Sequence, residues 1–250
     1  MNKVAIITGA TGGIGFEVAR RLGKDGFTVA LNGIDHEAGE KRIAELKEEG
    51  IDAEYYGFDV TQEDEVNSNI NRIGEKYGKI DVLVNNAGGL GGRSRFEDMT
   101  TEFYRFVMAL NLDSVFFASR AAIPYLKNGD NPCIINYTSN AAWNAGGPGA
   151  GIYGTSKAGV HTITRALAKD LAEYGIRVNA VSPGTIDTPF HKQIKSTKPE
   201  VFASWANNIM LGRLGQPEDV AGVISFLVSK DASFITAETI QIGGGQALGI

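Results

Sequence analysis

The chain has 250 residues, of which 43% are hydrophobic and 21% are charged, and its formal net charge is −5. Such a length and composition are ordinary for a globular protein and allow one large α/β domain or two small ones. The acidic balance argues against a nucleic-acid partner, because phosphate binding requires a basic face. The single cysteine, Cys133, excludes an internal disulfide, and the three histidines lie too far apart in sequence to form a metal-ligand motif.

The first apolar run, Val4 to Ile7, is too short for a secretion signal or a membrane span. The lone cysteine favours a reducing compartment, so we expect a cytoplasmic protein with no membrane partner. No linker, repeat or low-complexity segment divides the chain, and we expect a single domain over residues 1–250.

Short apolar runs alternate with longer amphipathic stretches along the chain. The runs are continuously apolar, as expected for strands whose two faces are both covered by helices. We predict strands at Val4 to Ile7, Thr28 to Leu31, Val82 to Val84, Cys133 to Tyr137, Val178 to Val181 and Ile240 to Ile242, and a strand, third in the sequence, that ends at Asp59-Val60. We predict helices at Gly13 to Asp25, His36 to Gly50, Gln62 to Tyr77, Thr101 to Leu126, Tyr153 to Tyr174 and Pro217 to Ser229. This alternation predicts right-handed crossovers and a parallel, doubly wound sheet flanked by helices.

The first predicted strand runs into a glycine-rich turn, and a helix follows at once. Gly9 lets the chain turn off the strand, while Gly13 and Gly15 let backbone N–H groups approach a pyrophosphate at the helix N-terminus. The glycine spacing is not that of the standard dinucleotide fingerprint, so a turn without a ligand is the alternative. The candidate phosphate-binding residues are Gly9, Thr11, Gly12, Gly13, Ile14 and Gly15.

Two further segments follow predicted strands at the same edge of the sheet. Asp59-Val60 closes the third strand, and Asn85-Asn86-Ala87-Gly88 closes the fourth. Ligands of doubly wound sheets bind outside the carboxyl ends of the strands, so both segments are candidates for the binding site. The Asp59 carboxylate could accept a hydrogen bond from an adenine amino group. Its alternative role is a helix N-cap, and the alternative role of the asparagines is turn formation.

Tyr153 and Lys157 stand four residues apart at the start of a predicted helix, so they share one face. A tyrosine with its ordinary pKa of about 10 transfers protons near neutral pH only if that pKa falls, and a nearby ammonium group has this effect. Ser139, just past the strand that ends at Tyr137, could orient a substrate carbonyl beside the Tyr153 phenol. Asn111, in an apolar helical segment, could hold a water that links Lys157 to solvent. The alternatives are a turn or N-cap role for Ser139 and a satisfied core amide for Asn111.

In this order, the motifs resemble those of the short-chain dehydrogenase/reductase superfamily over essentially the whole chain. Each motif is weak alone, but their combination and order are specific. The resemblance implies a single-domain Rossmann-type α/β fold and an enzyme that transfers a hydride between NAD(P) and a carbonyl or alcohol. It rests on Thr8-Gly9-x-x-x-Gly13-x-Gly15, Asn85-Asn86-Ala87-Gly88, Asn111, Ser139, Tyr153-x-x-x-Lys157 and Pro183-Gly184, and on the segments Arg177 to Ser182 and Gly212 to Val220.

The resemblance also implies residue roles. Tyr153 would be the general acid in reduction and the base in oxidation, and Lys157 would lower its pKa and hold the nicotinamide ribose. Ser139 would position the carbonyl, and Asn111 would anchor a proton-relay water. A lid over the substrate would span about residues 185–215, the protein would form a homodimer or homotetramer, and no metal is implied. The adenosine and nicotinamide parts of the cofactor site would be lined by Asn86, Ala87, Gly88, Pro183, Gly184, Ile186 and Thr188.

One departure from the family pattern concerns spacing. Ser139 and Tyr153 are 14 residues apart, one more than in many relatives. Thr138 is therefore a rival for the carbonyl-positioning hydroxyl. The glycine-rich loop from Asn140 to Gly151 could absorb the additional residue.

The end of the second strand bears on the choice of cofactor. NAD enzymes usually place an acidic residue there for the ribose 2′-OH, and NADP enzymes use an arginine for the 2′-phosphate. This chain has Asn32-Gly33-Ile34-Asp35, and Thr11-Gly12 in the glycine-rich turn supplies no cation. Asp35 would repel a 2′-phosphate, and the segment is similar to that of NAD-dependent 3-hydroxybutyrate dehydrogenases. We therefore expect NAD(H), with NADP(H) as the alternative.

The substrate is indicated by residues that the resemblance places at the mouth of the site. Arg93, Arg95 and the lid residues His191, Lys192, Lys195 and Lys198 would make a cationic mouth, which favours an anionic substrate. Trp143 and Trp205 favour a polyhydroxylated one. The alternatives are solvated charges and aromatic side chains that pack in the core or at an interface.

These features together resemble members that reduce uronate-derived deoxy-keto acids or oxidise deoxy-keto-gluconate, so we predict a sugar-derived keto acid as substrate. The predicted substrate residues are Arg93, Arg95, Ser139, Trp143, Tyr153 and His191. The alternative activity is that of a 3-oxoacyl carrier protein reductase, which would prefer NADPH and a basic outer patch. An alternative of another class is a non-catalytic, dinucleotide-binding regulatory protein, since fold does not dictate function.

Overall fold

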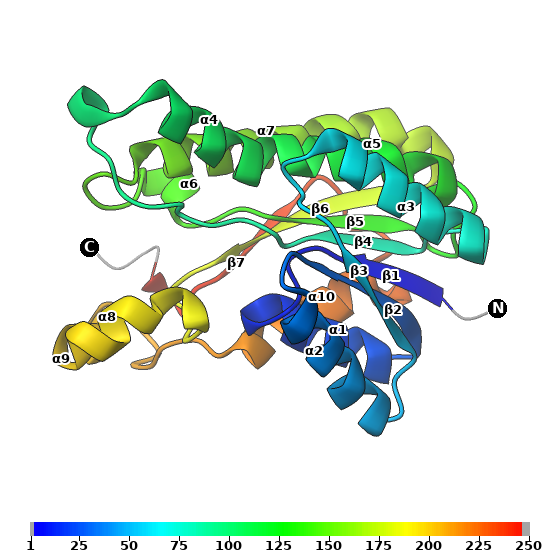
Figure 1. Ribbon diagram of the computed structural model, residues 1–250, viewed down its shortest axis with the longest axis horizontal. Helices are drawn as coiled ribbons and strands as arrows, with labels where there is room; N and C mark the ends of the chain where they lie inside the picture. The colour runs from blue at the N-terminus through cyan, green and yellow to red at the C-terminus, as the bar shows by residue number, and fades with distance from the viewer. Residues whose placement is uncertain (1–2, 247–250) are drawn as a thin grey trace.

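Seven parallel strands form the sheet of the computed structural model, which describes residues 3–246 (Figure 1). Their order across the sheet is β3-β2-β1-β4-β5-β6-β7. The predicted doubly wound, Rossmann-type α/β fold is confirmed. Residues 1–2 and 247–250 of the predicted domain lie outside the described residues. The strands are β1 (Lys3–Ile7), β2 (Phe27–Gly33), β3 (Ala53–Gly57), β4 (Val82–Asn85), β5 (Cys133–Tyr137), β6 (Arg177–Pro183) and β7 (Thr239–Ile242).

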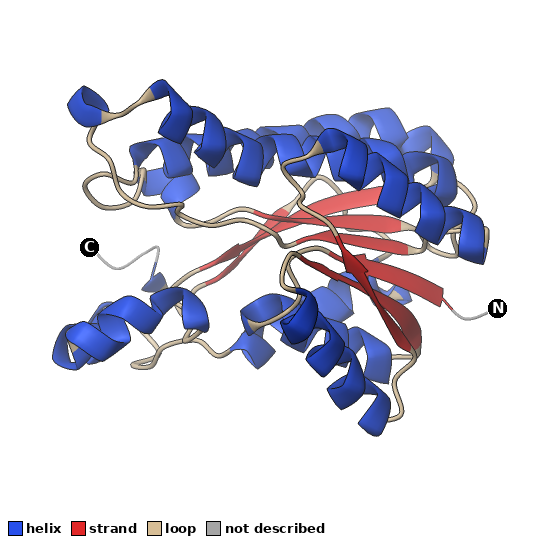
Figure 2. Ribbon diagram, viewed as in Figure 1, coloured by secondary structure: helices blue, strands red, loops and turns tan. Residues whose placement is uncertain are grey.

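Helices cover both faces of the sheet (Figure 2). Along β1 the side chains alternate between two cores: Val4 and Ile6 pack beneath α3 and α5, while Ala5 and Ile7 pack beneath α1 and α10. Because both faces of the strand are buried, its sequence is continuously apolar. One layer contains α3 (Glu63–Tyr77), α4 (Thr101–Met108), α5 (Ser114–Leu126) and α7 (Gly151–Leu171), and the other α1 (Gly13–Lys24), α2 (His36–Glu48) and α10 (Pro217–Val228).

Several elements differ from the prediction. The edge strand β3 ends before Asp59, and its partly exposed residues break the apolar run because it pairs with β2 alone. A π-helical segment, η2 (Ala109–Asp113), divides the predicted helix from Thr101 to Leu126, and α7 begins two residues before Tyr153. No pattern predicts the short helices α6 (Ala141–Asn144), α8 (Lys192–Thr197) and α9 (Pro199–Ser204) or the 3-10 turns η1 (Phe96–Asp98), η3 (Ala172–Tyr174), η4 (Pro189–His191), η5 (Trp205–Asn208) and η6 (Lys230–Ala232).

The helical stretch Thr101–Leu126 is long and apolar enough to cross a membrane by length and composition alone. In the structure it belongs to the helix layer above the sheet (Figure 1). Ala118, Ala122 and Leu126 on α5 are buried in the same core as strand residues Val4 and Ile6. Its apolar character therefore reflects packing against the sheet.

The direction in which successive strands are added to the sheet reverses between β1 and β4. The chain proceeds from β1 outward to β3 and then returns to β4 on the other side of β1. Such a switch point leaves a crevice at the carboxyl ends of the two strands, where ligands of this fold class bind. The segments Thr8-Gly9 and Asn86-Ala87 follow β1 and β4, so the two predicted segments meet there.

Candidate active site

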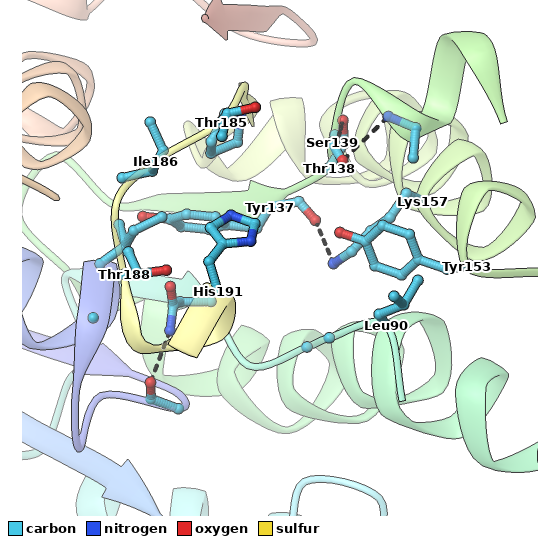
Figure 3. A pocket seen from close by; sticks show the side chains of 18 of the residues that line it. Leu90, Tyr137, Thr138, Ser139, Tyr153, Lys157, Thr185, Ile186, Thr188 and His191 are labelled. Atoms are coloured by element: carbon cyan, nitrogen blue, oxygen red, sulfur yellow. Dashed lines mark hydrogen bonds between the residues drawn. The ribbon is translucent and has the colours of Figure 1, made fainter. Parts of the chain in front are cut away.

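A cavity of about 540 Å³ opens at the carboxyl ends of the strands. The segments that follow β1, β4, β5 and β6 line it, together with the first turns of α7 (Figure 3). The cavity brings together most of the predicted site residues, namely Gly9, Thr11, Gly12, Gly13, Ile14, Gly15, Asn86, Gly88, Arg93, Ser139, Tyr153, Lys157, Pro183, Gly184, Ile186, Thr188 and His191.

Hydrogen bonds tie the glycine-rich turn to the segment after β4. The Asn86 side-chain amide donates to the carbonyls of Thr8 (2.8 Å) and Gly9 (2.9 Å). The Thr8 hydroxyl accepts from the backbone N–H groups of Asn86 (3.1 Å) and Ala87 (3.0 Å). Gly9 has a left-handed φ of 62°, and a Cβ there would lie 2.8 Å from Ala87 Cα. A glycine is thus required where the two segments meet.

The N-terminus of α1 opens into this cavity. Its N-cap residue, Gly12, makes no side-chain capping bond, so the first N–H groups of the helix are available to a ligand. Gly12, Gly13 and Gly15 also keep side-chain atoms away from the helix end, and all three line the cavity. These residues fit the pyrophosphate of a dinucleotide, because a helix N-terminus favours an anion.

Three side chains form the polar cluster at the other end of the cavity. The Ser139 hydroxyl and the Tyr153 phenol both line this end of the cavity. The Lys157 ammonium donates to the Tyr137 carbonyl (3.0 Å) and lies 5.8 Å from the centroid of the Tyr153 ring. Thr138, the rival hydroxyl, also lines the cavity, but it accepts a bond from the Ser139 N–H. Of the two hydroxyls, it is that of Ser139 that acts on the pKa of Tyr153.

Burial is the largest electrostatic influence on this cluster. It raises the pKa of Tyr153 above its ordinary value, and the hydrogen bond from Ser139 acts in the opposite direction. Burial lowers the pKa of Lys157 to about 8. We expected Lys157 to lower the tyrosine pKa, whereas the structure has the reverse net direction, because both groups are withdrawn from water. Near pH 8 the lysine is only half protonated.

Asn111 is fully buried in the π-helical segment η2. Its side-chain oxygen accepts from the Gly89 N–H (2.9 Å), and its nitrogen donates to the carbonyls of Gly89 (2.8 Å) and Val107 (2.9 Å). The side chain thus clamps the loop after Gly88 to the helix. A relay water at Asn111 stays a prediction, and it would have to donate to one of the oxygen atoms of this residue, because both side-chain N–H groups are already bonded to backbone carbonyls.

The residues predicted for the adenosine part lie outside the enclosed cavity. The Asp59 carboxylate accepts from the N–H and hydroxyl of Thr61, both at 2.9 Å, in a local turn that precedes the N-cap of α3. Val60 is buried in the core beneath α3. Gly33 packs on Thr11, Ile34 is 80% exposed, and the Asp35 carboxylate caps α2 by accepting from the Ala38 N–H. Ala87 contacts Gly9 but does not line the cavity.

The predicted substrate residues divide into two groups. Arg93 and His191 line the cavity, and the Arg93 guanidinium donates to the Pro148 carbonyl (2.9 Å). Arg95 and Trp143 do not line it, so the structure does not support these two assignments. Arg95 lies on the exposed turn before η1, and short helix α6 directs the Trp143 ring edge-on against His161, 4.8 Å between centroids.

The predicted lid segment, about residues 185–215, is less cationic than its sequence suggests. Lys195 forms an ion pair with Asp187, 2.8 Å between Nζ and a carboxylate oxygen, which partly neutralises it. The ring of His191 contacts Trp205 and Phe202, with centroids 5.2 Å and 5.8 Å away. Burial lowers the pKa of His191, although Asp187 opposes this shift. Trp205 therefore supports the lid through an aromatic cluster.

Arg42 and Tyr137 are among the residues near the site that sequence reasoning missed. Arg42 donates through Nε to the Thr11 carbonyl (3.2 Å), so a cation does lie beside the glycine-rich turn. Tyr137 lines the cavity, and its buried hydroxyl has no hydrogen-bond partner within residues 3–246. No local signal identifies either one, because Arg42 is 31 residues from Thr11 and Tyr137 ends an ordinary apolar strand.

Residues 9–247 match the family model described as enoyl-(acyl carrier protein) reductase, a member of the superfamily that the motifs resemble. The chain belongs to the short-chain dehydrogenase/reductase superfamily. This dehydrogenase/reductase is 37% identical over 243 residues to the 3-oxoacyl-(acyl-carrier-protein) reductase FabG of Thermotoga maritima, covering 97% of both chains. It is 35% identical to cyclopentanol dehydrogenase of Comamonas testosteroni, covering 98% of this chain and 96% of the relative.

Solved structures agree with this membership. Actinorhodin polyketide ketoreductase, a variant solved with NADPH, superimposes with a TM-score of 0.92 at 33% identity, over 98% of this chain and 97% of the other. Aldohexose dehydrogenase of Thermoplasma acidophilum superimposes with a TM-score of 0.89 at 34% identity, over 99% and 94%. The short-chain dehydrogenase/reductase described here is thus an NAD(P)-dependent oxidoreductase that acts on CH–OH and C=O groups.

Proposed function

We propose that Tyr153 exchanges the proton, and that the residues around it hold the carbonyl or alcohol carbon beside a bound nicotinamide. The observation that carries this proposal is that Ser139, Tyr153 and the buried ammonium of Lys157 lie together in one cavity. A bound nicotinamide supplies or accepts the hydride. Ser139 orients the substrate oxygen, and Lys157 stabilises negative charge on the phenol oxygen.

Replacing Tyr153 by phenylalanine tests the proposed acid. Tyr153→Phe is expected to lower kcat at least about 100-fold, because the positioned proton donor is lost. The dissociation constant for NADH, measured by fluorescence titration, should stay within about threefold of wild type. Tyr56→Phe is the matched control, since its hydroxyl bonds Glu54 away from the cavity. Retained turnover in Tyr153→Phe would exclude this residue as the acid.

The proposed cofactor is NAD(H). Asp35 is an acidic residue at the end of β2, which disfavours a 2′-phosphate. A side chain at Gly33 would collide with the Thr11 methyl, because a Cβ there would lie 2.4 Å from it, so the acid stands two positions later. Arg42 is the nearest cation at Thr11, but its guanidinium is paired with Glu45 at 2.7 Å.

Comparing kcat/KM for NADH and NADPH tests the cofactor assignment. We expect NADH to be preferred at least about tenfold, which corresponds to roughly 1.4 kcal/mol. Arg42→Ala should change the NADH value little. If NADPH is preferred and Arg42→Ala removes that preference, Arg42 serves the 2′-phosphate and the assignment to NAD(H) is wrong.

The proposed substrate class is a sugar-derived keto acid, such as a uronate-derived deoxy-keto acid or deoxy-keto-gluconate. Arg93 at the cavity supports an anionic group, and one similar structure is named an aldohexose dehydrogenase. Arg93→Ala should raise KM for such an acid several-fold with little change in kcat. Arg95→Ala, outside the cavity, is the matched control and should leave KM unchanged. Equal KM values in all three proteins would remove the argument for an anionic substrate.

The second candidate is 3-oxoacyl carrier protein reduction, which the 37% identity to FabG favours. Turnover of an acetoacetyl thioester with NADPH, faster than that of the keto acid with NADH, would support it.

A homotetramer in the cytoplasm completes the proposal. Exposed aromatic side chains on two separate faces support the assembly, and the free, buried Cys133 is compatible with a reducing compartment.

A further inference from the structure

The last described turn of the chain folds back onto the end of β6. β7 is an edge strand that pairs with β6 as far as Pro183 opposite Ile242. Beyond it, three glycines, Gly243 to Gly245, form a turn closed by the bond from the Gln246 N–H to the Gly243 carbonyl (2.9 Å). This turn returns Gln246 to the segment that follows β6, although β7 itself has ended.

Within the described residues, the Gln246 side chain makes its hydrogen bonds to Thr185. Its oxygen accepts from the Thr185 N–H (2.8 Å) and hydroxyl (3.2 Å), and its nitrogen donates to the same hydroxyl (2.9 Å). The preceding N–H, that of Gly184, is bonded to the Ile242 carbonyl (2.9 Å) as in a continuing strand pair. The Gln246 amide therefore supplies the next rung of the ladder, which the backbone of β7 no longer reaches.

Thr185 belongs to the segment after β6 that lines one side of the cavity. Ile186, Thr188 and His191 follow it, and Figure 3 places Thr185 and Ile186 together at the edge of this site. The segment is also held by the Thr185 carbonyl, which accepts from the Gly215 N–H (3.0 Å). The Gln246 bonds are thus one of the two ties on Thr185, and they set where the cavity-lining residues lie.

We propose that Gln246 is a positioning residue for the nicotinamide half of the bound dinucleotide. By fixing Thr185, its amide holds Ile186 and Thr188 in the shape that receives this half. The inference rests on the proposed function. It differs from that function in concerning the affinity for the cofactor rather than proton transfer.

Two substitutions separate the hydrogen bonds from mere volume. Gln246→Leu removes all three bonds to Thr185, whereas Gln246→Glu keeps the two acceptor contacts. We expect Gln246→Leu to raise the dissociation constant for NADH about 5- to 10-fold, as the loss of one or two net hydrogen bonds implies. Gln246→Glu should stay within about threefold of wild type. The constant for ADP, which lacks the nicotinamide half, should stay within about twofold in both variants.

Gln241→Leu is the matched control, because it makes the same change on the exposed side of β7. It should leave NADH binding unchanged. The proposal is overturned if Gln246→Leu binds NADH like wild type, if NADH and ADP weaken equally, or if Gln246→Glu fails to restore affinity. A wild-type protein that binds neither NADH nor NADPH would instead refute the proposed function and this inference with it.

Discussion

At the scale of single residues, the burial of Lys157 lowers the stability of the folded protein. Its side chain is 3% exposed, and the bond to the Tyr137 carbonyl is the hydrogen bond that holds its ammonium. A lysine buried in this way would ordinarily be replaced by an apolar residue, because desolvating its charge costs free energy. Under the proposed function the lysine has an electrostatic role, because a nearby ammonium favours the ionised form of the Tyr153 phenol.

The pH dependence of stability follows from this burial. The pKa of Lys157 is lowered to about 8 in the folded protein, below its ordinary value of 10.5. Between these values the unfolded chain binds more protons, so the stability of the wild type rises with pH through this window. Below pH 8 the penalty is fully present. Lys157→Met removes the buried ammonium, so its free energy of unfolding should exceed that of the wild type at pH 7. This difference should shrink by roughly 2–3 kcal/mol from pH 7 to pH 10.5.

Urea unfolding of both proteins at several pH values measures this difference. Lys169→Met, on the exposed side of the same helix, is the control for removing a lysine from α7. A difference between Lys157→Met and wild type that stays constant from pH 7 to pH 10.5 would contradict a depressed lysine pKa.

At the scale of elements, the π-helical segment η2 connects a helix to a loop. An α-helix satisfies its own backbone, but Asn111 in η2 turns its amide outward to the Gly89 backbone. Insertions of this type are frequent at functional sites. Here the insertion fixes the loop after Gly88, which lines the cavity beside Lys157.

Asn111→Leu tests this clamp. The substitution keeps the volume but removes the side-chain partners of the partly buried Gly89 N–H and carbonyl, and each loss costs about 1–3 kcal/mol. We expect the free energy of unfolding to fall by about 2–4 kcal/mol and NADH binding to weaken. Ser114→Ala, which removes one bond to the Leu110 carbonyl within the same helical stretch, should cost about 1 kcal/mol or less. A decrease in the free energy of unfolding of less than about 1 kcal/mol in Asn111→Leu would show that the Asn111 bonds to Gly89 contribute little to stability.

At the scale of the whole molecule, exposed aromatic residues gather on two separate helix layers. Tyr104, Phe106 and Phe116 are exposed on α4 and α5, while Phe226 and Phe234 are exposed on and beyond α10, with Phe234 fully in solvent. These layers lie on opposite faces of the sheet (Figure 1). Two independent self-complementary interfaces generate a tetramer with dihedral symmetry.

Light scattering during gel filtration tests the proposed tetramer. Phe116→Glu and Phe234→Asp should each reduce the mass to that of a dimer, because each places a charge in one interface. The double variant should be a monomer. Ile34→Glu changes another exposed large apolar residue, just after β2, and should leave the tetramer intact. A monomeric wild type would refute the assembly.

The sheet, the helices that cover it and the pairing of Tyr153 with Lys157 were predictable from the sequence alone. Continuous apolar runs identify strands buried on both faces, and four-residue spacing places Tyr153 and Lys157 on one side of α7. Both signals are local, since each depends only on the period of an element. The bounds of the edge strand β3 were not predicted, because its residues are only partly buried and its apolar run is interrupted.

The contacts between residues that are far apart in the sequence became visible only in the tertiary structure. Arg42 reaches Thr11 from another helix, and Gln246 reaches Thr185 across 61 residues. The same packing leaves Trp143 and Arg95 out of the cavity lining and reverses the expected pKa shift of Tyr153. Burial and side-chain partnership depend on how layers pack, and no periodicity along the chain encodes which groups a particular packing withdraws from water.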